Sequence, residues 1–220
     1  MRALLLKEFR LVVHPSTYVM VILGSLVLIP NWLYAVILLY GVLTAFFNAQ
    51  NAREMHDLSY SFALPVSRAD MVRARVLVMV LIEVALVGVM ALGLAARSIL
   101  GIDEIALSQP MVGLPANVAL LGCSLAALGI FNVAFFPLYY RDPNKIGVPF
   151  LLACIPFFMF CVLFEAIPYI PGEAFAALST LGFANAGVQI SALCVGVALF
   201  ILLTLFAVRR ARSAFADFDA

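Results

Sequence analysis

The residue with the clearest chemical potential is Glu83, the only acidic side chain well inside an apolar stretch of this 220-residue chain. A carboxylate in hydrocarbon is costly, so it usually faces protein or water and often belongs to an ion pathway. Three interpretations of Glu83 follow: it lines a translocation path, it pairs with a basic residue inside the protein, or it is protonated and hydrogen-bonded. Glu165 lies near the end of its apolar stretch, beside Pro168, and is less informative.

The polar residues typical of catalytic and metal sites form no recognisable pattern. Glu54, His56 and Asp57 cluster along the chain, but a helix or turn would point them in different directions. The four cysteines lie in apolar stretches and form no C-x-x-C pair. We therefore interpret them as small buried hydrophobic residues. No phosphate-binding loop, H-E-x-x-H or G-x-S-x-G motif is present. We therefore expect no catalytic residue, no metal and no cofactor in this chain itself.

The elements that carry these residues must lie in lipid. The chain is 65% hydrophobic and 11% charged, whereas soluble domains are about 45–50% apolar and about 25% charged. At about 20 residues for each crossing, the composition predicts an all-α integral membrane protein with six transmembrane helices. The predicted spans, all in one transmembrane domain over 1–220, are 16–30, 32–50, 76–96, 112–139, 146–168 and 186–208.

The distribution of positive charge predicts the orientation of these spans. Twelve of the 13 Lys and Arg residues fall on one side of the membrane, and only Arg97 falls on the other. Because positive loops face the cytoplasm, we expect both the N- and the C-terminus to be cytoplasmic. The expected location is the plasma (cell) membrane, in a bacterium. The formal net charge of +1 gives no bulk attraction to nucleic acid.

Residues 2–13 differ from the spans because they combine an apolar face with charges. The apolar residues that share one helical face are Leu5, Leu6, Phe9, Val12 and Val13, and the charged residues opposite are Lys7, Glu8 and Arg10. This pattern favours an amphipathic helix in the membrane interface, which turns into the bilayer at His14-Pro15. The alternative is a plain extension of the first span, because Leu4 and Leu11 interrupt the polar face.

The segment 51–75 is the longest polar stretch of the chain. Its middle, residues 58–64, is too apolar for a simple solvated linker and too short to cross a membrane. Pro65 breaks the chain, and Ser67 is placed to cap a new helix with Asp70 three residues later. The segment is either a short docking helix for a cytoplasmic partner or an amphipathic loop packed on lipid headgroups. The pattern alone leaves both open.

A face of small residues predicts how the fourth span packs. Gly122, Ala126 and Gly129 lie on one side of it, which favours close helix contact within the chain or between copies. Further along, residues 168–185 are semi-polar with helical spacing. This spacing indicates a short re-entrant or interfacial helix before the last span.

At 64–68 the residues Leu-Pro-Val-Ser-Arg, followed by Met71-Val72 and Arg75, resemble a motif of type-2 ATP-binding cassette (ABC) exporter permeases. The opening MRALLLKEFR, with its Lys-Glu pair, is similar to the start of that family. The resemblance implies a transmembrane subunit that forms a homo- or heterodimer with a second permease. It also implies separately encoded ABC ATPase subunits, which bind ATP and Mg²⁺ and dock on a coupling helix at about residues 54–64.

On this resemblance the residues expected to couple the chain to the ATPase are Glu54, Asp57, Leu58, Tyr60, Phe62, Pro65 and Arg68. Substituting Asp57 or Tyr60 is then expected to uncouple ATP hydrolysis from transport without unfolding the bundle. Two rival functions stay open: an ion-coupled secondary transporter or channel that uses Glu83, and a non-transporting membrane anchor subunit. A neighbouring gene for a phosphate-loop ATPase would favour the exporter.

Overall fold

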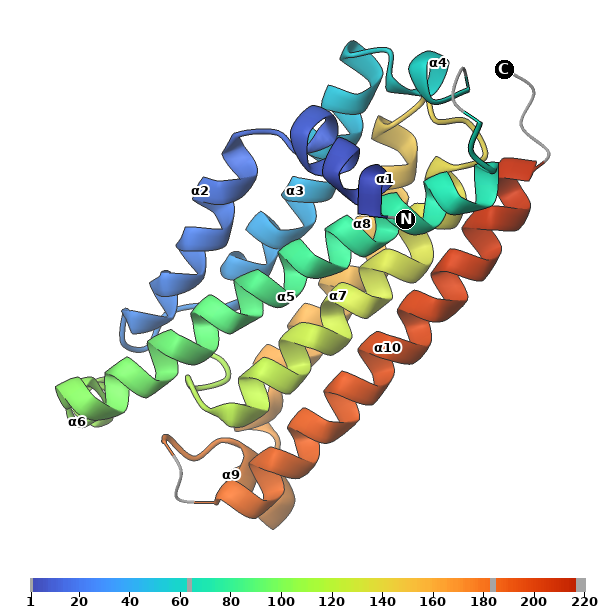
Figure 1. Ribbon diagram of the computed structural model, residues 1–220. Coiled ribbons are helices and arrows are strands. Elements are labelled where there is room, and N and C mark those ends of the chain that lie inside the picture. The colour runs from blue at the N-terminus through green and yellow to red at the C-terminus, as the bar shows by residue number, and fades with distance from the viewer. Residues whose placement is uncertain (1, 63–64, 183–184, 217–220) are drawn as a thin grey trace.

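Long apolar helices make up most of the computed structural model, which describes residues 2–62, 65–182 and 185–216. The helices that are long and apolar enough to cross a membrane are α3 (Ala35–Glu54), α5 (Arg68–Leu100), α7 (Val118–Tyr139), α8 (Gly147–Glu165) and α10 (Ala186–Ala216). Within the described ranges the only β-pairing is an isolated bridge between Asn117 and Gly182. The chain is therefore an all-α, multi-pass membrane protein, and its long helices α5, α7 and α10 lie side by side (Figure 1).

The N-terminal helices add a sixth candidate crossing. Helix α1 (Arg2–Lys7) continues as a π-helical turn, η1 (Glu8–Val12). The chain then bends by 93° into α2 (Ser16–Ile22), which ends in the 3-10 helix η2 (Leu23–Leu28). The bend lies at His14-Pro15, where the sequence predicted a turn, because proline lacks the backbone N–H that a continuous helix needs.

The predicted N-cap of α5 is confirmed. Ser67 Oγ accepts a hydrogen bond from the Asp70 backbone N–H at 3.1 Å and donates one to Asp70 Oδ2 at 2.7 Å. Helix α5 consequently begins at Arg68 and runs for 33 residues to Leu100, beyond the predicted apolar span at both ends. Gly101 ends it in the left-handed region, with a φ of 67°.

Helices α7 and α10 also differ from the predicted spans. Helix α7 begins at Val118 rather than at 112, because Asn117 Oδ1 caps it by accepting a hydrogen bond from the Leu120 N–H at 3.0 Å. Helix α10 runs to Ala216 rather than 208. Its last turns contain alanine and arginine, which are strong helix formers outside lipid as well as inside it.

Helix α7 lies inside the bundle and packs against both α8 and α10. Aromatic side chains fill its contact with α8: the ring of Phe131 lies 5.9 Å from that of Phe150 and 6.2 Å from that of Phe157. Phe135 continues the stack toward Tyr139. Most of α8 and α10 is exposed, as expected for apolar helices that face lipid.

The packing of α7 on α10 depends on glycine. Gly122 lies against Gly196 of α10, and a Cβ added to either residue would collide with the backbone of the other helix. Gly129 lies close to the backbone of Phe200, and Ala126 between the two glycines is buried. The predicted small-residue face therefore takes part in a contact within the chain.

The end of the bundle opposite the termini contains a buried arginine. Arg97 is 1% exposed, and its guanidinium donates to the Val27 carbonyl and to the Tyr34 hydroxyl, both at 2.8 Å. It also pairs with Asp103 of the short helix α6 (Ile102–Leu107) at 2.9 Å. Arg97 thus joins η2 and the start of α3 to α5.

Glu165 is more important structurally than its position at a span end suggested. One of its carboxylate oxygens accepts a hydrogen bond from the Ala35 N–H and the other from the Leu114 N–H, both at 2.8 Å. The first bond caps the N-terminus of α3, where backbone N–H groups have no partner within the helix. The second bond holds the loop before α7.

The chain between α8 and α10 forms two short helices. These are the 3-10 helix η3 (Ile167–Tyr169) and α9 (Glu173–Leu178). Helix α9 is the helix that the spacing of 168–185 indicated, although it covers only six residues. Residues 183–184 of that segment lie outside the described ranges.

Candidate functional site

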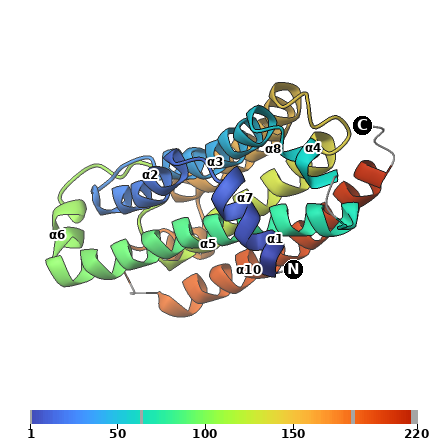
Figure 2. The same ribbon diagram turned by 45° about the horizontal axis from the view of Figure 1, so that its top comes forward.

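A short surface helix, α4 (Asp57–Phe62), connects α3 to α5 at the end of the bundle that carries both termini (Figures 1 and 2). The chain leaves α3 through a left-handed turn at His56, whose φ is 50°. Helix α4 is shorter than the predicted coupling helix over 54–64, because Glu54 is the last residue of α3. Residues 63–64 lie outside the described ranges.

The inner side of α4 rests on a cluster of four charged side chains, which we call the charge cluster: Lys7, Glu8, Asp57 and Arg75. The Lys7 Nζ lies 2.6 Å from Asp57 Oδ1 and 3.1 Å from Glu8 Oε1. The Arg75 guanidinium pairs with Glu8 Oε2 at 3.0 Å and with Asp57 Oδ2. Two cations and two carboxylates thus alternate in a closed ring of ion pairs with no net charge.

Burial makes the charge cluster a strong constraint on the fold. The side chains of Glu8 and Asp57 are 2% exposed and those of Lys7 and Arg75 are 10% exposed. Removing one partner of a buried ion pair leaves an uncompensated charge and costs about 3–5 kcal/mol. The four residues come from α1, η1, α4 and α5, so the ring fixes these elements relative to one another.

Two polar side chains extend the charge cluster. Lys7 Nζ donates a hydrogen bond to Ser61 Oγ of α4 at 2.5 Å, and Arg75 Nη1 donates one to the Tyr139 hydroxyl at 3.4 Å. Tyr139 is the last residue of α7. A third connection runs through the bend after η1, where the Asn48 carboxamide oxygen of α3 accepts a hydrogen bond from the His14 N–H at 2.7 Å.

The N-terminal helix divides its faces differently from the predicted pattern, and its place in the membrane interface stays a prediction. Lys7 and Glu8 face the protein, whereas Leu6 and Phe9 are exposed although the sequence placed them on one face with the buried Val12. The reason is the π-helical turn η1, whose hydrogen bonds reach one residue further than those of an α-helix and so shift the faces. The ion pairs of Lys7 and Glu8 offset the cost of burying these charges. Leu6 and Phe9 consequently lie on the outer surface of the bundle.

Asp57 also lies elsewhere than the sequence suggested. It was expected to couple the chain to an ATPase, which stays a prediction; in the structure it is 2% exposed and pairs with Lys7 and Arg75. Its position makes Asp57 a residue that holds α4 in place. Phe62 is half-buried as well, and its ring stacks 6.0 Å from that of Phe215 in α10. The Leu58 side chain lies outside the part of the chain that the structure describes.

The remaining predicted coupling residues lie on the outer surface: Glu54, Tyr60, Pro65 and Arg68. The Tyr60 side chain is 53% exposed, and Met55 at the start of the turn is 61% exposed. Arg68 is anchored by two contacts, with its guanidinium 5.4 Å above the Phe62 ring and a hydrogen bond to the Ala216 carbonyl at 3.2 Å. The outer side of α4 therefore exposes Tyr60, with Met55 exposed in the turn before it, while its inner side is fixed by the charge cluster.

Glu83 lies in the middle of the bundle, 0% exposed, on the side of α5 that faces α7. Asn132 Nδ2 donates a hydrogen bond to Glu83 Oε2 at 2.8 Å. Glu83 Oε1 and Asn132 Oδ1 have no hydrogen-bond partner among the described residues. The carboxyl group is thus paired with an amide rather than a cation, and a part for Glu83 in transport stays a prediction.

Sequence reasoning missed the partners of the buried charges. Asn132 gave a usable signal, because a second polar residue in an apolar span is a natural partner for an intramembrane carboxylate. Glu8 and Arg75 gave none, since they are 67 residues apart and each also fits a solvated surface. Across the described residues, no group of three His, Cys, Asp or Glu side chains is arranged to hold a metal ion.

Comparison with known proteins gives no match at a significant level: no family model, no curated sequence and no solved structure is similar to this chain.

Proposed function

We propose that the chain is the membrane-spanning permease subunit of an ABC exporter, which forms a dimeric translocation path with a second permease. Separate ATPase subunits that bind ATP and Mg²⁺ drive it. The observation that carries the proposal is the two-sided construction of α4. Its outer face exposes Tyr60, and its inner face is joined through Asp57 to Arg75 of the longest helix. The described part of the Leu-Pro-Val-Ser-Arg motif, residues 65–68, leads into α5, which supports the proposal.

In this proposal the end of the bundle with both termini faces the cytoplasm, as the bias of positive charge favours. The ATPase binds the outer face of α4, and closure of the ATPase dimer on ATP displaces that helix. Because separating buried ion pairs is costly, α4 moves together with η1 and α5. A small displacement at the surface becomes a rigid-body shift of membrane helices.

A pair of tyrosine variants tests the proposal. Tyr60 and Tyr18 are 53% and 59% exposed, but Tyr60 is on α4 and Tyr18 is on α2. The complex is purified through a tag on this chain, after expression with the neighbouring ATPase gene, and its ATP hydrolysis is measured. We expect Tyr60→Ala to lower stimulated hydrolysis about tenfold, since a central interface aromatic contributes about 1–2 kcal/mol or more. Tyr18→Ala should match the wild type.

Two results would contradict the proposal. One is that no phosphate-loop ATPase purifies with the wild-type chain. The other is that Tyr60→Ala binds and stimulates the ATPase as the wild type does.

The unpartnered Glu83 Oε1 favours one rival, an ion-coupled transporter or channel. In that case the chain alone, in liposomes, conducts protons or cations, and Glu83→Gln abolishes the flux. The exporter proposal expects no such flux from the chain alone, with or without Glu83.

A further inference from the structure

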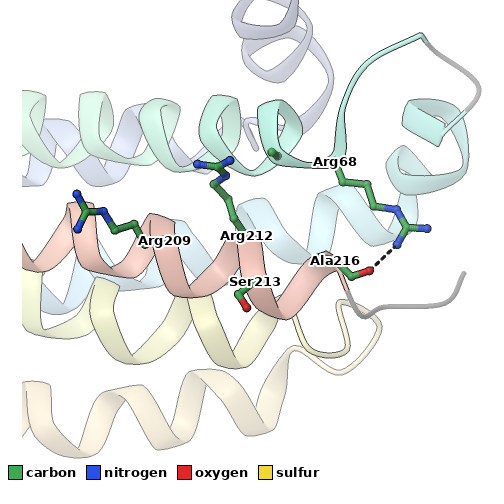
Figure 3. A pocket seen from close by; sticks show the side chains of 6 residues that line it. Arg68, Arg209, Arg212, Ser213 and Ala216 are labelled. Atoms are coloured by element: carbon green, nitrogen blue, oxygen red, sulfur yellow. Dashed lines mark hydrogen bonds between the residues drawn. The ribbon is translucent and has the colours of Figure 1, made fainter.

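A groove runs along the outside of the bundle between α5 and α10, and it changes character along its length. Near the termini it contains a hollow of about 640 Å³ lined by Arg68, Arg209 and Arg212 (Figure 3). Further along the same two helices lies a second hollow of about 380 Å³. The side chains that line it are almost all apolar, among them Leu77 and Leu205.

The basic hollow has positive charge without a matching acceptor. Figure 3 shows Arg212 reaching from α10 toward α5, with Arg209 one turn away, whereas Arg68 turns aside to the Ala216 carbonyl. Among the described residues, no acceptor bonds to the side chains of Arg209 and Arg212. The Arg212 Nε–H is buried from water as well. Arg209 is exposed and Arg212 half-buried, and both line the hollow, so their guanidinium groups can donate charge-assisted hydrogen bonds to a ligand that supplies anionic oxygen atoms.

The apolar hollow follows the basic one along the same two helices, since Arg73 and Val208 line it about one turn from Ala69 and Arg212 of the basic hollow. Arg73 lines its near end, where it is partly neutralised by Asp70 at 3.4 Å. From Ile201 at the far end to Arg212 the helix rises about 16 Å, and the side chains change from apolar to cationic only in the last turns. A molecule that fits this surface has an anionic head and an apolar chain, in that order.

We propose that the α5–α10 groove binds one anionic phospholipid. Its phosphate lies against Arg209 and Arg212, and an acyl chain follows Leu77 and Leu205 along the groove. An inorganic ion would satisfy the arginines but leave the apolar hollow open. A second copy of the chain packed symmetrically on this groove would bring the same unpaired arginines of both copies into one interface, which is unfavourable. The proposal requires only that the helices lie in a membrane.

The charge requirement is tested by lipid titration followed by native mass spectrometry on detergent-purified, delipidated protein. The wild type should bind dioleoyl phosphatidylglycerol in preference to dioleoyl phosphatidylcholine. Each arginine near an anionic surface contributes about a factor of five, so Arg209→Gln with Arg212→Gln should weaken phosphatidylglycerol binding roughly 30-fold. The matched control, Arg53→Gln with Lys145→Gln, removes the same charge from the same end and should bind normally.

The requirement for an acyl chain is tested with variants that keep all the arginines. Leu205→Trp fills the apolar hollow and should weaken phosphatidylglycerol binding about tenfold. Leu202→Trp, on a more exposed side of the same helix and outside the hollow, should have no effect. Inorganic phosphate at millimolar concentration should not displace the lipid, and helical content by circular dichroism shows whether each variant is folded.

Three results would overturn the proposal. The first is equal binding of the two lipids by the wild type. The second is unchanged phosphatidylglycerol binding by the folded double arginine variant or by Leu205→Trp. The third is a wild-type dimer that Leu205→Trp converts to a monomer, which would assign the groove to a second copy.

Discussion

At the scale of single residues, the charge cluster acts as one neutral unit. Lys7 and Arg75 each contact both carboxylates, so no member can change its charge without leaving the ring unbalanced. The same logic explains why Asp57 and Glu8 tolerate burial that would be prohibitive for either alone. The expectation that Asp57 variants lose coupling without losing stability is therefore revised: Asp57 affects stability first.

Asp57→Asn leaves the cluster with one excess positive charge and should cost about 3 kcal/mol. For a chain of this length the cost corresponds to a decrease of about 6–12 °C in the Tm, measured in detergent by scanning fluorimetry or circular dichroism. Adding Lys7→Gln restores neutrality and should recover at least half of the lost Tm. The exposed Arg73→Gln is the control and should change the Tm by less than about 2 °C. Strictly additive losses in the double variant would contradict this interpretation.

Contacts between residues close in sequence were predictable, whereas contacts between residues far apart were not. The Ser67–Asp70 cap was predicted and confirmed, because the motif lies within three residues and its geometry is local. The pairing of Glu8 with Arg75 was not, because a single sequence contains no measure of which distant charges meet.

At the scale of elements, two contacts fix how the helices are arranged. One is the 93° bend before α2, which Asn48 ties to α3. The other is the seam of small residues between α7 and α10, where Gly122 and Gly196 bring the backbones together. Without a hydrophobic force between helices in lipid, such close packing is what holds apolar helices together. The bend is held by hydrogen bonds to a single side chain, and the seam by backbone packing over several turns.

Gly122→Ala tests the seam against Gly88→Ala on α5. A Cβ at position 122 meets the α10 backbone, which cannot move aside locally, so we expect a loss of about 1–3 kcal/mol from overpacking. A Cβ at position 88 meets nothing within 4 Å, and alanine favours the helix, so its stability should stay equal or rise by up to about 1 kcal/mol. The measurement is thermal unfolding in detergent. Equal effects of the two substitutions would show that the seam does not depend on glycine.

The long helices were predictable where hydropathy alone identifies them. The apolar stretches identified the long helices, but the ends of α5 and α10 extend into charged sequence that hydropathy cannot assign. The N-terminal faces were wrong because the π-helical turn η1 breaks the 3.6-residue period on which the prediction relied.

At the scale of the whole molecule, α5 is tied near both of its ends to elements that precede it in the chain. Near the termini Arg75 joins it to η1 and α4, and at the opposite end Arg97 joins it to Val27 and Tyr34. Helices α8 and α10 both pack on α7 and form a second group with it. Glu83 and Asn132 meet where the two groups touch, so a shift of one group against the other would act on that pair.

The central claim is that α4 receives force from an ATPase, and photo-crosslinking in the native membrane tests it most directly. A benzophenone amino acid replaces Tyr60 in one strain and Tyr18 in another, and captured proteins are identified by mass spectrometry. We predict that position 60 captures a protein with a phosphate-loop ATPase sequence and that position 18 does not. Capture of no such ATPase from position 60, or equal capture from both positions, would contradict the account.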